Sequence, residues 1–142
     1  MRDDLTSRTF AIGLWMLCIS VPLGLTLEAL HAFKVPVYLG SPLRRELWTL
    51  AHAHANLLGM LCMVMAHTAA RWAPASLHRR RVLRGLAIGA VTMPLGFLAG
   101  GVLAYEGDPS LGILLVPVGG LVLLWALLRA ALNLPRPEAA GD

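Results

Sequence analysis

The stretch "LWTLAHAHANLLGMLCMVMAHTAA", from Leu47 to Ala70, decides the fold of this chain. It contains no Asp, Glu, Lys or Arg, and it exceeds the roughly 20 helical residues that cross a hydrocarbon core of about 30 Å. Yet its first half carries two histidines and an asparagine, which are polar groups that lipid penalises. The stretch therefore predicts a membrane-spanning helix whose polar side chains face protein or a cavity.

The composition of the whole chain agrees with a membrane protein. Of its 142 residues, 57% are hydrophobic and 14% are charged, and the mean hydropathy is +0.68. The apolar stretch after Arg8 precedes no small-residue cleavage site, so we interpret it as a retained span and not as a signal peptide. The sequence predicts one all-α transmembrane domain over residues 1–142, a polytopic four-helix bundle with spans at residues 10–33, 42–71, 83–105 and 109–132.

The basic residues predict the orientation of this bundle. Cytoplasmic loops carry an excess of Lys and Arg, and the loop between the second and third spans is the most basic. We therefore expect both termini in the cytoplasm and the chain in the inner (plasma) membrane. Although the net charge is +4, this distribution argues against a nucleic-acid partner. The basic residues expected inside are Arg2, Arg8, Arg71, Arg79, Arg80, Arg81, Arg84, Arg129 and Arg136, and those expected outside are Lys34, Arg44 and Arg45.

Small residues and helix start signals indicate how the spans pack and where they begin. The third span has two GxxxG spacings between Gly85 and Gly100, which let a neighbouring backbone approach closely. This span is therefore predicted to be the central packing helix. Ser41 and Pro42 are typical of a helix start, and Asp108 is expected to cap the last helix.

The histidines of the second span point in different directions. At about 100° per residue, His52 shares a stripe with Asn56 and Gly59, while His54 points about 160° away from His52. Ionisable residues in spans normally face protein or a cavity, so we expect His52 to face the bundle interior. His54 is expected to face a neighbouring helix, a partner subunit or a cofactor.

A second pair of candidate ligands ends the first span. Glu28 and His31 stand at i and i+3, a spacing that turns both side chains toward the same point. Together with His52 they predict an outer-leaflet cluster of nitrogen and oxygen donors, with Asn56 as a hydrogen-bond partner. Such a set suits a transition metal ion, namely copper, zinc or iron. A di-iron site would need a second Glu-x-x-His pair, which the sequence lacks.

The same residues also admit a purely structural reading. His31 and His52 would then donate to backbone carbonyl groups freed by Pro22, and Glu28 would form an ion pair. The candidate partners of Glu28 are Lys34, Arg44 and Arg45.

The motif "HAHANLLG" resembles the second helix of the catalytic subunits of the haem-copper oxidase and nitric oxide reductase superfamily. That resemblance implies an axial ligand to a b-type haem at His52 or His54, with a second ligand from His31 or a symmetry mate. The other histidines of the oxygen-reducing centre have no counterpart here, so the resemblance implies no oxygen or nitric oxide reduction. The pattern "LEALHAFK" followed by "RRELWTLAHAHANLLG" is also similar to uncharacterised bacterial integral membrane proteins with four helices.

Three functions follow as hypotheses from the sequence. The first is a membrane protein that binds a transition metal or haem b in its outer half and can serve as a redox subunit. The second is a non-enzymatic accessory subunit of a larger membrane complex or a homo-oligomer, embedded in the lipid bilayer. The third is a small proton or solute carrier that uses Glu28, His31 and His52 as a relay.

Overall fold

The structure is a computed structural model of the chain, and it describes residues 4–72, 77–102, 104 and 107–134. Helices form nearly all of this part, and it contains no β-strand. In chain order the elements are α1 (Asp4–Ala32), α2 (Pro36–Leu39), α3 (Pro42–Trp72), α4 (Leu77–Val102), the 3-10 helix η1 (Leu111–Leu114) and α5 (Leu115–Ala131).

Four of these helical segments are long and apolar enough to cross a membrane, as the sequence predicts. Their mean hydropathy is 2.0 for α1, 1.3 for α3, 1.7 for α4 and 2.5 for the combined segment η1–α5. The value is lowest for α3 because this helix carries three histidines and one asparagine within its apolar part. The all-α prediction is thus confirmed.

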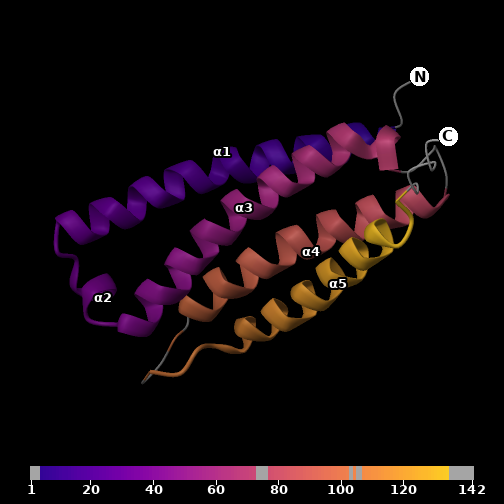
Figure 1. The fold of residues 1–142 in the computed structure, drawn as a ribbon. Helices are drawn as coiled ribbons and strands as arrows, with labels where there is room; N and C mark the ends of the chain where they lie inside the picture. Colours follow the sequence, from indigo (N-terminus) through magenta and orange to yellow (C-terminus); the bar gives the residue numbers. More distant parts are fainter. Residues whose placement is uncertain (1–3, 73–76, 103, 105–106, 135–142) are drawn as a thin grey trace, which may run out of the picture.

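The long helices pack as an open row (Figure 1). Helix α1 packs on α3, α3 packs on α4, and α4 packs on α5, whereas the contact between α1 and α4 is less extensive. In a closed up-and-down bundle the first and last helices would be neighbours. Here α1 and α5 lie at opposite edges of the row, and α3 and α4 form its centre (Figure 1).

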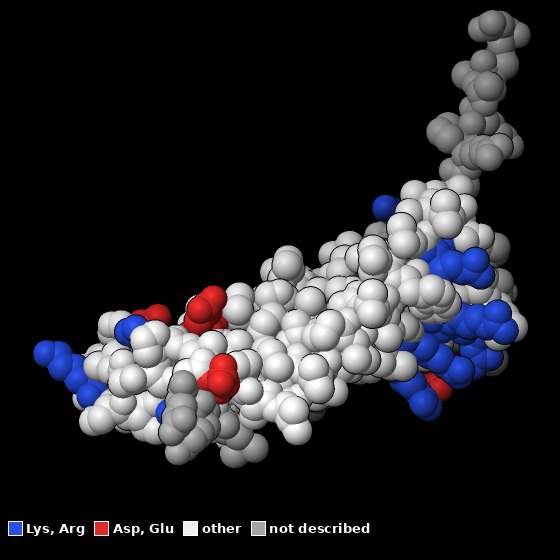
Figure 2. Space-filling view, turned by 90° about the horizontal axis from the view of Figure 1, so that it is seen from below, with Lys and Arg blue, Asp and Glu red and all other residues white. Residues whose placement is uncertain are grey.

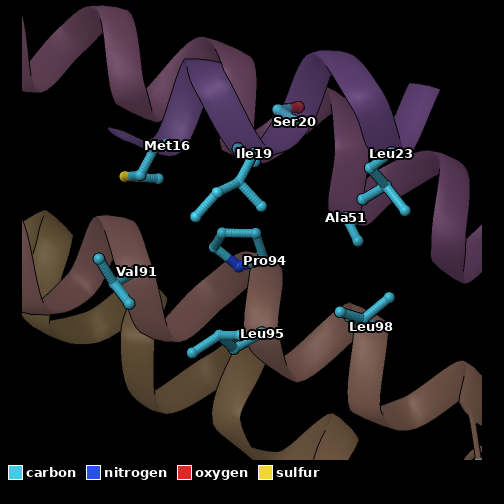
Figure 3. A pocket seen from close by; sticks show the side chains of 10 residues that line it. Met16, Ile19, Ser20, Leu23, Ala51, Val91, Pro94, Leu95 and Leu98 are labelled. Atoms are coloured by element: carbon cyan, nitrogen blue, oxygen red, sulfur yellow. The ribbon is translucent and has the colours of Figure 1, made fainter. Parts of the chain in front are cut away.

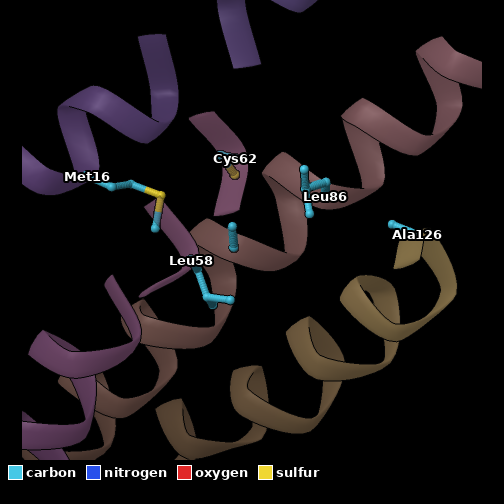
Figure 4. Packing of buried hydrophobic residues seen from close by; sticks show 6 residues of the cluster. Met16, Leu58, Cys62, Leu86 and Ala126 are labelled. Atoms are coloured by element: carbon cyan, nitrogen blue, oxygen red, sulfur yellow. The ribbon is translucent and has the colours of Figure 1, made fainter. Parts of the chain in front are cut away.

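The core lies where α4 meets its neighbours, as the GxxxG spacings predict. Leu83, Leu86 and Ala90 are all fully buried, and close helix contacts are possible because small residues face each other. At the α1–α3 crossing, a Cβ added to Gly13 would lie 2.5 Å from the carbonyl oxygen of Gly59, so the two backbones touch. Figure 4 shows the main cluster, which includes Met16, Leu58, Cys62, Leu86 and Ala126.

Charged residues gather at the two ends of the row and leave its middle apolar (Figure 2). Helix α1 begins and α5 ends at the same end, which also holds the end of α3 and the start of α4 (Figure 1). The described arginines of this basic end are Arg8, Arg71, Arg79, Arg80, Arg81, Arg84 and Arg129. Arg2 and Arg136, which the sequence places on the same side, lie outside the described residues.

The helix ends test the predicted start signals. Helix α3 begins at Pro42, and the backbone N–H of Arg44 donates to the Ser41 hydroxyl at 3.3 Å, as expected. The expected cap at Asp108 is wrong. Ser110 is the N-cap of η1, and its hydroxyl accepts from the N–H of Gly112 at 3.3 Å. Ser110 takes this role because the chain stays extended beyond the aspartate and turns into a helix only at residue 111.

Candidate functional site

His52 lies between α1 and α3, in the interior position that the sequence predicts. Its Nδ1 atom is 2.9 Å from the carbonyl oxygen of Ser20, and the Ser20 hydroxyl donates to the carbonyl oxygen of His52 at 3.0 Å. A Cβ added to Gly24 would lie 2.5 Å from Cε1 of the ring, so only glycine leaves room for the imidazole there. Two reciprocal hydrogen bonds and a glycine therefore fix the ring against α1.

Asn56 completes this network from one helical turn away. Its side-chain amide nitrogen is 3.2 Å from Nε2 of His52 and 3.2 Å from the His52 carbonyl oxygen. Because the Ser20 carbonyl can only accept, Nδ1 carries the ring proton and Nε2 offers its lone pair to the Asn56 amide. Both ring nitrogens of His52 therefore have a hydrogen-bond partner in this network.

His54 points away from His52, as the helical periodicity predicts. Its Nδ1 atom donates to the carbonyl oxygen of Leu50 at 2.8 Å, and its ring centroid lies 4.8 Å from that of Phe97 on α4. This bond places the proton on Nδ1, which leaves the Nε2 lone pair of His54 available. The two histidines therefore serve opposite interfaces of α3, one with α1 and the other with α4.

Glu28 and His31 do not join this network in the described part of the chain. Both side chains are exposed near the end of α1, one and two turns beyond Gly24, against which His52 packs. Across the described residues, no group of three or more His, Cys, Asp or Glu side chains could hold a metal ion. The convergence of Glu28, His31 and His52 on one ligand therefore stays a prediction.

The candidate ion pair of Glu28 with Arg44 is replaced by a different contact. The Arg44 guanidinium donates to the carbonyl oxygens of Val37 at 2.6 Å and Gly101 at 3.0 Å. It also lies 5.8 Å from the ring centroid of Trp48. Arg44 therefore ties α2, α3 and the end of α4 together. The basic residue itself is visible in the sequence, but its partners are main-chain atoms that no residue pattern reveals.

A cavity of about 140 Å³ lies between α1, α3 and α4 and was not predicted (Figure 3). Two small side chains of α3 line it, and larger side chains from α1 and α4 face each other across it (Figure 3). Almost all of its surface is apolar. The only sequence signal is the small size of the α3 residues, since three helices must be assembled to enclose the space. The lining residues are Met16, Ile19, Ser20, Leu23, Ala51, Ala55, Val91, Pro94, Leu95 and Leu98.

Comparisons of the chain with protein-family models, with curated proteins and with solved structures found no match.

Proposed function

We propose that this chain is a non-enzymatic accessory subunit of a membrane complex or homo-oligomer. It lies in the inner membrane, with its basic end on the cytoplasmic side. The observation that carries the proposal is the closed hydrogen-bond network of His52. Ser20 and Asn56 satisfy both ring nitrogens, so the imidazole joins two spans and has no free nitrogen for a reaction. A polar side chain in a span whose hydrogen-bonding groups are all used in this way stabilises the packing of two helices.

The open row of helices supports the same proposal. Helices α1 and α5 lie at the edges and are the least buried of the four spans, with 17% and 11% of the residues of their most apolar windows buried inside the chain. Two edge helices give a subunit two lateral surfaces for neighbours in the bilayer. The excess of arginines at one end favours the cytoplasm for that end.

The experiment compares His52→Ala with the matched control His67→Ala in the same helix. His67 is exposed and His52 is half-buried. Interhelical hydrogen bonds in membranes contribute about 0.6 kcal/mol each on average, so loss of the network should cost about 1–2 kcal/mol. We expect His52→Ala to lower the melting temperature and the size of the native complex, with an unchanged optical spectrum, while His67→Ala leaves all three unchanged. A spectral change in His52→Ala alone would contradict the accessory role.

A transition metal or haem b bound at His54 is the second candidate function, and one observation favours it. Ligating histidines usually donate their other ring N–H to a carbonyl or carboxylate, and His54 donates Nδ1–H to Leu50 in this way. A histidine of a second copy would supply another ligand, because His31 of the same chain lies exposed near the end of α1, away from the α3–α4 interface. The candidate predicts a Soret band or stoichiometric copper, zinc or iron in gently extracted protein, lost in His54→Ala. Absence of both from wild-type protein would exclude this candidate.

The third function, a small proton or solute carrier, stays a prediction. It is tested by a proton flux in liposomes that Glu28→Gln would abolish.

A further inference from the structure

We infer that the groove between α1 and α4 binds one anionic phospholipid of the leaflet at the basic end. The headgroup phosphate lies between Arg8 and Arg84, and one acyl chain runs along the groove into the apolar cavity. Two features that the accessory role does not use support this lipid site, namely the cavity and the arginines at the start of α1 and α4.

Arg8 on α1 and Arg84 on α4 lie at corresponding positions along these two parallel helices. Helices α1 and α4 both run away from the basic end (Figure 1), and both contribute to the cavity, α1 through Ile19 and α4 through Leu95. Arg8 precedes Ile19 by 11 residues, and Arg84 precedes Leu95 by 11 residues. Eleven residues are about three helical turns, so each arginine lies on the same helix face as its cavity residue. Arg8 and Arg84 therefore stand at one depth beside the same groove.

The distance between the arginines and the cavity matches an acyl chain. At 1.5 Å per residue, 11 residues span about 16 Å, and half of a hydrocarbon core of about 30 Å is about 15 Å. A chain whose phosphate lies at the arginines thus ends at the cavity. Ile19 and Leu95 are 66% and 51% exposed, so the cavity opens sideways where lipid lies. Ala51 (Figure 3) and Ala55 line the cavity, and larger side chains at these two positions would fill it.

Charge complementarity identifies the headgroup as anionic. Among the described residues of the basic end, Asp4 is the one acidic residue, and it pairs with Arg8 at 2.8 Å. Both side chains of this pair are at least 70% exposed, so water screens it and a phosphate can replace it. Arg84 is exposed and forms no ion pair with a described carboxylate. Basic clusters beside a span attract anionic headgroups, and here the apolar groove adds a place for the chain.

The test uses the full chain in phosphatidylcholine vesicles with spin-labelled phosphatidylglycerol or spin-labelled phosphatidylcholine as the probe. The label sits near the methyl end of the acyl chain, and the motionally restricted fraction is measured by electron paramagnetic resonance. We expect phosphatidylglycerol to be restricted in preference to phosphatidylcholine. Arg84→Gln should lower this preference roughly fivefold, as expected for one arginine near the membrane surface. The control Arg71→Gln removes an exposed arginine at the end of α3 and should leave the preference unchanged.

A second pair of variants tests the chain site. Ala55→Leu fills part of the cavity and should release the restricted chain of both probes, whereas Ala53→Leu, on the exposed face of the same helix, should not. Circular dichroism establishes that each variant is folded. If Ala55→Leu fails to fold, the comparison of Arg84→Gln with Arg71→Gln still tests the inference. Equal losses in Arg84→Gln and Arg71→Gln would overturn the inference in favour of diffuse surface attraction. An unrestricted chain end in the wild type would overturn it, and so would displacement of the lipid by inorganic phosphate alone.

Discussion

The ring of His52 fills a space that only a glycine on the facing helix leaves open. A Cβ at Gly24 would lie 2.5 Å from Cε1 of the ring. The bond that Nδ1 donates to the Ser20 carbonyl and the bond that Nε2 accepts from the Asn56 amide prevent the ring from moving aside. The imidazole is therefore held by shape as well as by hydrogen bonds. Either change alone, a larger residue at position 24 or a loss of the ring, disturbs the same contact.

Gly24→Ala tests this coupling. In the wild-type background the added methyl group overpacks the α1–α3 interface, and we expect the free energy of unfolding to fall by about 1–3 kcal/mol. In a His52→Ala background the methyl group meets open space, so the same substitution should become neutral or stabilising. Thermal unfolding of the four proteins of this double-mutant cycle in detergent gives the measurement. Equal effects of Gly24→Ala in both backgrounds would contradict the described contact.

Lys34 adopts a backbone conformation that suits glycine better. Its φ is +52°, and it ends α1 with two bonds, from the N–H of Lys34 to the carbonyl of His31 at 3.1 Å and from the N–H of Val35 to the carbonyl of Leu30 at 3.0 Å. This is the Schellman arrangement, in which a left-handed residue closes the helix. For a residue with a Cβ, the left-handed conformation is about 1–2 kcal/mol less favourable than the right-handed one.

Lys34→Gly should therefore stabilise the protein by about 1 kcal/mol, because glycine reaches the left-handed region without that cost. The expected readout is a higher melting temperature at an unchanged helix content. Lys34→Ala is the control, because it removes the same charge and keeps the Cβ, and it should leave the melting temperature unchanged. A gain of the same size in both variants would assign the effect to the charge and not to the backbone.

At the scale of elements, the α4–α5 pair depends on backbone contact. A Cβ at Gly89 would lie 2.8 Å from the carbonyl oxygen of Gly119 and 2.8 Å from the backbone nitrogen of Leu123. Backbone atoms cannot give way as a flexible side chain can. By contrast, a Cβ at Gly120 would meet only the end of the Met93 side chain, at 3.5 Å.

We expect Gly89→Ala to push α5 away from α4 and to destabilise the protein by about 1–3 kcal/mol, despite the better helix propensity of alanine. Gly120→Ala serves as the matched control and should be neutral or stabilising. Chemical unfolding followed by far-ultraviolet circular dichroism compares the two. If both glycines tolerate alanine equally, the close approach of α4 and α5 is contradicted.

The helices were more predictable from the sequence than the contacts between them. Hydropathy predicted four spans, and the Ser41–Pro42 signal predicted the start of α3, because these features depend on residues close together in the chain. Periodicity also placed His52 and His54 on different faces. The structural alternative correctly had His52 donate to a backbone carbonyl group of α1. It did not identify Ser20, since every residue presents the same carbonyl group to a neighbouring helix. The cavity escaped prediction for the same reason, because three helices enclose it.

At the scale of the whole molecule, the two ends differ in charge. The end where α1 begins holds seven described arginines, namely Arg8, Arg71, Arg79, Arg80, Arg81, Arg84 and Arg129. At the opposite end, basic side chains are accompanied by acidic ones (Figure 2). This asymmetry predicts the orientation by the positive-inside rule.

The orientation can be tested with single cysteines in a protein whose native Cys18 and Cys62 are replaced by alanine. Lys34→Cys lies at the end expected outside, and Arg71→Cys lies at the basic end; both positions are exposed. In intact cells, a membrane-impermeant maleimide should label Lys34→Cys only, and Arg71→Cys should be labelled after permeabilisation. The reverse pattern would place the basic end outside and would also move the proposed lipid site to the other leaflet.

The bond between Ser20 and His52 has a consequence for biogenesis. Helix α3 is the least apolar of the four spans, so it gains least from leaving the translocon for lipid. The ribosome delivers α1 first, and α1 already carries the carbonyl acceptor and the glycine notch that receive the imidazole. The first span therefore acts as a docking template for the second. In a chain synthesised without α1, Nδ1 of His52 would lack its carbonyl partner on Ser20, so we expect α3 to insert into the bilayer less efficiently.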